Sequence, residues 1–103
     1  MRPVVISGAG MIPFERRDED SLIDMLSMAG LKAMDDAGVD IAILRVPVWQ
    51  EWLHLDTCKI INDEAAVLCE KSKGRLYATA CLPPWGGKEN LYELERCVKE
   101  LGM

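Results

Sequence analysis

The stretch "GLKAMDDAGVDIAILRVP", residues 30–47, predicts the end of a helix, a tight turn and a buried strand. Small and apolar side chains before Gly38 recur at helical spacing, and Gly38 supplies the left-handed residue on which many helices end. The β-branched run that starts at Ile41 does not alternate with polar residues, which favours a strand covered on both faces. Pro47 has no N–H to donate, so regular strand pairing should stop there.

The same helix-to-strand alternation runs along the whole chain. Strands are expected at residues 3–7, 41–48 and 75–82, and helices at about 22–38, 56–72 and 88–101. Gly74 and Gly102 are expected to end the second and third helices. The order βαβαβα indicates parallel strands joined by right-handed crossovers. We therefore predict a single α/β domain, residues 1–103, with a partial TIM-barrel-like sheet in the order 1-2-3. The alternative is a flavodoxin-like sheet in the order 2-1-3.

The third predicted helix has an apolar stripe and a charged face. Its inward stripe is expected to comprise Leu91, Leu94, Val98 and Leu101. The charged side chains are expected to form a solvated face: Glu89, Glu93, Glu95, Arg96, Lys99 and Glu100.

Composition limits the classes of protein to which the chain can belong. Half of the 103 residues are hydrophobic and 28% are charged, as in globular proteins. The net charge of −5 disfavours binding to nucleic-acid phosphates. The apolar run Val4–Ile6 is too short for a signal peptide or a membrane span, so we expect no membrane association and a cytoplasmic location.

The four cysteines show no CxxC pair. Each falls among apolar neighbours in a predicted regular element, which is typical of buried, reduced thiols. We therefore expect neither a disulfide framework nor a metal site built on cysteine.

Two short motifs are weak as functional signals. The "SGAG" sequence at residues 7–10 follows the first predicted strand, but Pro13 stands where a dinucleotide fingerprint needs a glycine that opens a helix. His54 is the only histidine, so a common zinc site or a Ser–His–Asp triad cannot be located around it. No cofactor is predicted.

Aromatic side chains give the stronger signal, because they lie in loops that leave the carboxyl ends of the predicted strands. Ligands bind at that edge in parallel α/β folds. An arginine there can hold a carboxylate while indole rings stack on an aromatic ligand. The alternative is that the rings seal the end of the sheet or a subunit contact. The candidate ligand-binding residues are Phe14, Arg45, Trp49, Trp52, His54 and Trp85.

Two family resemblances divide the chain. "VVISGAGMIPFERR" and "SLIDMLSMAGLKAMDDAGVD" resemble the start of a thiolase-family protein and cover residues 1–40. "MDDAGVDIAIL", "INDEAAVLCEKSKGRLYATACLPP" and "ENLYELERCVKELGM" resemble the amidohydrolase superfamily, in its aromatic-acid decarboxylase-like branch, over residues 34–103. The second resemblance implies successive βα units of a TIM barrel. The chain thus looks like a chimera or fragment joined at the shared "AGVD".

Neither resemblance supplies catalytic residues. The amidohydrolase branch usually carries an HxH metal motif on its first strand, where this chain has "VVISGAG". Thiolases need a nucleophilic cysteine in a small-residue context, which Cys81 in "TACLPP" does not provide. We therefore predict no catalytic residue and no metal ligand.

Three units in the order 1-2-3 place every helix on one face of the sheet, which leaves the other face bare, including either Ile41 and Ile43 or Ala42, Leu44 and Val46. Bare aliphatic surface drives association, so we expect a homodimer or higher oligomer without catalytic activity. Two alternatives stay open. One is a partial or divergent amidohydrolase-type hydrolase or decarboxylase acting on small aromatic carboxylic acids, and the other is a small-molecule binding module that uses the loop tryptophans.

Overall fold

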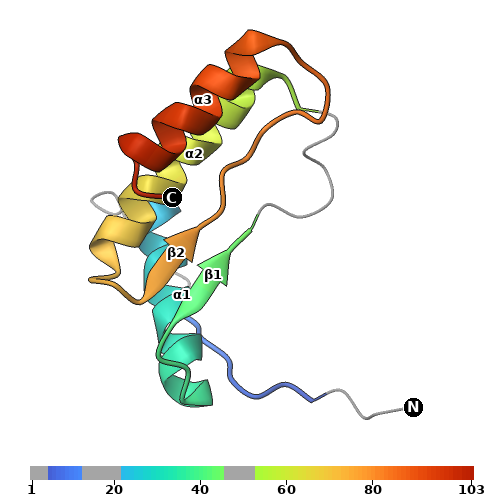
Figure 1. Ribbon diagram of the computed structural model, residues 1–103. Helices are drawn as coiled ribbons and strands as arrows, with labels where there is room; N and C mark the ends of the chain where they lie inside the picture. The colour runs from blue at the N-terminus through green and yellow to red at the C-terminus, as the bar shows by residue number, and fades with distance from the viewer. Residues whose placement is uncertain (1–4, 13–21, 46–52) are drawn as a thin grey trace. The chain divides into compact units, whose positions relative to one another are not determined.

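The computed structural model describes residues 5–12, 22–45 and 53–103, and these residues form three helices and two strands (Figure 1). In chain order the elements are α1 (Leu22–Ala37), β1 (Ala42–Leu44), α2 (Leu55–Lys71), β2 (Leu76–Ala78) and α3 (Lys88–Lys99). Two compact units divide the chain at β1, the first being Met1–Ala42 and the second Ile43–Met103. The prediction of a mixed α/β protein is confirmed.

The segment before α1 does not form the predicted strand. Residues 5–7 have no strand geometry, and the side chains of Val5 and Ile6 are 77% and 91% exposed. A strand needs a neighbour for its N–H and C=O groups, and no strand of the described residues pairs with this segment. The segment runs along α1 instead, where the Ala9 N–H donates to the Asp36 carboxylate (3.2 Å). Residues 3 and 4 lie outside the described residues.

Glycines allow this segment to approach α1 closely. A Cβ atom on Gly10 would stand 1.8 Å from the Ala29 carbonyl oxygen, and one on Gly8 would stand 2.4 Å from that of Ala33. Both alanines lie four residues apart, on one face of the helix. The "SGAG" motif therefore packs backbone against helix, a role that the sequence alone did not indicate.

The second unit contains a short parallel sheet. β1 and β2 lie side by side and are connected through α2 (Figure 1). Pairing extends to Thr79, whose N–H donates to the Leu44 carbonyl (3.0 Å). Just beyond β2, the Cys81 N–H donates to Asn62 Oδ1 (2.7 Å) and the Cys81 carbonyl accepts from Asn62 Nδ2 (3.0 Å). A side chain of α2 thus takes the place of a partner strand there, which explains why β2 is shorter than predicted.

The predicted helix ends are confirmed at all three glycines. Gly38, Gly74 and Gly102 have φ values of 68°, 86° and 70°, in the left-handed region that glycine adopts without steric cost. Each lies one to three residues beyond the end of its helix. None of the helices that the structure describes combines the length and the apolar character needed to cross a bilayer.

Sulfur and hydrogen-bonded polar groups make up much of the core of the second unit. The buried apolar side chains are those of Cys58, Leu76, Cys81 and Cys97, and the buried polar ones are those of Asn62, Ser72 and Glu93. All four cysteines are free thiols, and Cys69 alone among them is only half-buried. The prediction of burial is confirmed for three of the four.

α3 faces the core with a different side from the one predicted. Leu91, Leu94 and Val98 are 65%, 41% and 56% exposed, so the prediction of an inward stripe is wrong for them. The prediction that Glu93 belongs to the solvated face is also wrong, because its side chain is only 2% exposed. The helix is turned so that Glu93 and Cys97, one turn apart, point inward. Hydrogen bonds to Glu93 from α2 and from its own helix make this burial possible.

Candidate functional site

The structure brings two of the six predicted ligand residues together. His54 and Trp85 line one surface depression of about 410 Å³. Arg45 directly follows β1, is exposed, and does not line this depression. The other three predicted ligand residues lie outside the described residues: Phe14, Trp49 and Trp52.

Two helices begin at this depression. α2 starts after His54 and α3 starts after Gly87, and neither helix has a side-chain hydrogen bond at its N-cap. Their first-turn N–H groups and the positive ends of their dipoles favour an anion. Trp85 adds an aromatic surface that is 72% exposed, while the Glu89 carboxylate opposes negative charge.

Asn90 fixes the loop that carries Trp85. Its Nδ2 donates to the carbonyl of Pro83 (3.0 Å) and, at longer range, to that of Trp85 (3.4 Å). A Cβ atom on Gly86 would stand 2.3 Å from this nitrogen, so glycine gives the amide room to reach both carbonyls. The loop is thereby tied to the first turn of α3.

A polar network that runs from the core to the surface connects α2, α3 and the segment after β2. We call it the Asn62–Glu93 cluster, and it comprises Asn62, Asp63, Cys81, Glu93 and Arg96. Glu93 Oε1 accepts hydrogen bonds from Asn62 Nδ2 (2.9 Å) and Arg96 Nη2 (2.8 Å), and Glu93 Oε2 accepts from Arg96 Nε (2.8 Å). Arg96 Nη1 donates in turn to Asp63 Oδ1 (2.7 Å).

The hydrogen bonds of the cluster stabilise the charged forms of Glu93 and Arg96. Hydrogen bonds from Arg96, and next from Asn62, outweigh burial and lower the pKa of Glu93 from 4.5 to about 2. Hydrogen bonds to Glu93 and Asp63 raise the pKa of Arg96 above its ordinary value. Since Glu93 stays ionised around neutral pH and its oxygens are occupied, it is poorly suited to transfer protons. The cluster therefore stabilises the packing of α2 against α3.

Three thiols lie in the core beside this cluster. Cys58 Sγ and Cys81 Sγ are 3.7 Å apart, and the Cys97 thiol donates to Glu93 Oε1 (3.5 Å). Burial is the main cause that raises the pKa values of Cys81 and Cys97 to about 11, so both are protonated and weakly nucleophilic at neutral pH. Within residues 5–12, 22–45 and 53–103, no three cysteine, histidine or carboxylate side chains are grouped so as to hold a metal ion.

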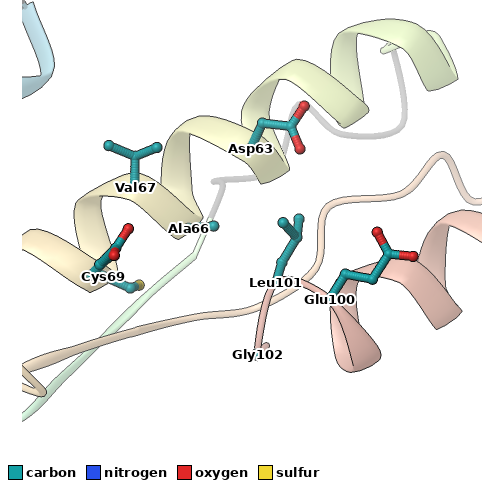
Figure 2. A pocket seen from close by; sticks show the side chains of 8 residues that line it. Asp63, Ala66, Val67, Cys69, Glu100, Leu101 and Gly102 are labelled. Carbon is teal, nitrogen blue, oxygen red and sulfur yellow. The ribbon is translucent and has the colours of Figure 1, made fainter.

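A hollow of about 620 Å³ lies between α2 and the end of α3 (Figure 2). Its lining includes the apolar side chains of Val67 and Leu101 and the carboxylates of Asp63 and Glu100. Asp63 is paired with Arg96, and burial raises the pKa of the Cys69 thiol there. These groups form no activated nucleophile, and the predicted ligand residues that the structure describes do not line this hollow.

Sequence reasoning missed Asn62 and Glu93. Asn62 lies four residues after Cys58, so helical spacing alone places both on one face of α2. Glu93 gives no such signal, because its burial depends on Asn62, 31 residues earlier in the chain.

No protein-family model matches the chain, and no solved structure is found to match it. The resemblances to amidohydrolases over residues 34–103 and to thiolases over residues 1–40 therefore stay predictions from the sequence.

Proposed function

We propose that the chain is a non-catalytic α/β module that associates with a second copy of itself through the exposed apolar side of α3. The observation that carries this proposal is the stripe of Leu91, Leu94 and Val98, which leaves three aliphatic side chains 41–65% exposed on one side of one helix. Leu91 and Leu94 also line a depression of about 460 Å³ beside Leu82 and Pro83, which extends the apolar surface. Contiguous surface of this kind favours a protein contact.

The spacing of the stripe favours a second copy as the occupant. Leu91, Leu94 and Val98 are separated by three and then four residues, so two antiparallel copies of α3 present matching stripes. Leu91 of one copy then faces Val98 of the other, and the two Leu94 side chains meet near a twofold axis. Antiparallel packing also places opposite ends of the two helix dipoles together.

The small sheet supports the same proposal. A two-stranded sheet is marginal by itself, and each strand here has only three residues. Ile43 and Tyr77 are 71% and 52% exposed, and within the described residues neither strand has a second partner strand. A cytoplasmic location is a further part of this proposal.

Sedimentation velocity at increasing protein concentration tests the association. We expect a dimer for the original chain, and we expect Leu94→Glu to weaken dimerisation by at least about tenfold, or about 1.4 kcal/mol, because it buries an unpaired carboxylate. Ile60→Glu is the matched control, since Ile60 is 63% exposed on α2. A monomer at every concentration, or equal dissociation by both variants, would contradict the proposal.

A second candidate function is the binding of a small aromatic carboxylate at His54 and Trp85. The observation that favours it is that both side chains line one depression, with two helix N-termini beside them. Such a site suits a carboxylate at the N–H groups and a ring on the indole.

Tryptophan fluorescence titrated with benzoate tests this second function. Binding should give a saturable change in the original chain that is lost in Trp85→Leu. Arg45→Gln serves as the control because Arg45 does not line the depression. A linear or flat response in the original chain would rule out the site.

A further inference from the structure

Two thiols from different parts of the second unit face each other in its core. Cys58 lies on α2 and Cys81 follows β2, and their Sγ atoms are 3.7 Å apart. The side chains are 0% and 1% exposed, so neither thiol belongs to the proposed self-association surface. This pair therefore has no part in the function proposed above.

Asn62 holds Cys81 in this position. The asparagine side chain both donates to the Cys81 carbonyl and accepts from the Cys81 N–H. Asn62 is one helical turn after Cys58, so the clamp fixes the backbone of Cys81 beside the face of α2 that carries Cys58. The short distance between the two sulfur atoms thus follows from a specific set of hydrogen bonds.

We propose that Cys58 and Cys81 form a two-electron oxidation site that a peroxide converts into an intramolecular disulfide. With hydrogen peroxide as the oxidant, one thiol loses its proton and the resulting thiolate attacks the peroxide. The O–O bond breaks, the sulfur becomes a sulfenic acid, and the hydroxide that leaves takes up the proton and forms water. The second sulfur then attacks the sulfenic sulfur, forms the S–S bond and expels a second water. Each thiol loses one proton and one electron, and the peroxide is reduced to two waters.

The geometry requires a modest approach of the two sulfur atoms. They must move from 3.7 Å to the bonded distance of about 2.05 Å. Because Asn62 holds the backbone of Cys81, this approach has to come from small movements of the two cysteine side chains. Burial and the raised pKa of Cys81 make the reaction slow at neutral pH.

Treatment of the reduced full chain with hydrogen peroxide tests the site. We expect two of the four thiols to be lost, as counted after unfolding, and the intact mass to fall by two hydrogen atoms. Peptide mapping should join the peptide of Cys58 to that of Cys81, and a reducing agent should restore both thiols.

Serine variants separate this pair from the other thiols. Cys58→Ser and Cys81→Ser should each slow formation of an intramolecular disulfide by at least about tenfold, whereas Cys69→Ser should leave it unchanged. A bond through Cys69 or Cys97, a link between two chains, or a mass gain from added oxygen would overturn the proposal. So would retention of all four thiols. The peptide map of the original chain identifies the bonded cysteines directly, so it decides the matter even where a variant does not fold.

Discussion

Replacing Asn62 with leucine is expected to lower the free energy of unfolding of the second unit by about 4 kcal/mol. Asn62 is fully buried and makes three hydrogen bonds, two to the backbone of Cys81 and one to the Glu93 carboxylate. Leucine has nearly the same shape but cannot make any of them. The Cys81 N–H and C=O then stay buried without a partner, and Glu93 loses one of its three strong donors.

Urea unfolding followed by circular dichroism measures this loss as a lower midpoint at an unchanged slope. Glu64→Leu is the matched control, because Glu64 is exposed on the same helix two residues later. It should change stability by less than about 0.5 kcal/mol. A loss of under about 1 kcal/mol in Asn62→Leu would mean that water replaces the amide, contrary to its burial.

Local signals in the sequence were enough for the ends of the helices. Each helix is followed within three residues by a glycine, and this local signal needs no distant partner. Gly38, Gly74 and Gly102 all have the left-handed backbone that their positions predict. The strand predicted before Gly8 depended on a partner strand elsewhere, and residues 5–7 find none within the described residues. Apolar composition alone therefore overpredicted strand there.

Hydrophobicity alone points to the wrong inward face of α3. Leucines at positions 91 and 94 are the stronger apolar signal, yet the helix buries Glu93 and Cys97. Three hydrogen-bond donors, from Asn62 and Arg96, compensate the buried carboxylate. Such long-range compensation has no periodic signature in a single sequence. The same error concealed the exposed stripe on which self-association is now proposed.

The predicted order of strands and helices accounts for the positions of the site's loops, but not for their conformations. The parallel order placed the loops of His54 and Trp85 at one edge of the sheet, and the structure brings these two side chains to one depression. The arrangement of the loop itself depends on Asn90 and on the space left by Gly86. Neither residue has a pattern that would have marked it in advance.

Acid should destabilise the second unit through Glu93. Its pKa is about 2 in the folded chain, below the ordinary value of 4.5 that applies after unfolding. A carboxyl group whose folded pKa is lowered stabilises the fold fully above the unfolded pKa and loses that contribution as pH falls through the folded pKa. The loss thus falls between about pH 4.5 and pH 2 and amounts to about 3 kcal/mol.

Arg96→Met is expected to remove most of this acid dependence, because Arg96 is the largest cause of the lowered pKa. The variant should be less stable than the original chain by about 3 kcal/mol near neutral pH, where a buried carboxylate loses its partner. The two should converge near about pH 2, where Glu93 becomes protonated. Urea midpoints across this range measure both effects.

Glu95→Gln provides the control for general acid effects, because the Glu95 carboxylate pairs with Lys99 at an exposed position. Its profile should parallel that of the original chain at every pH. The difference in unfolding free energy between Arg96→Met and the original chain should shrink as the pH falls. If it stays constant from neutral to acid pH, the group that causes the acid dependence is not Glu93. A constant difference would also show that Arg96 contributes through packing of its side chain, since an ion pair with Glu93 must weaken when the carboxyl group takes up its proton.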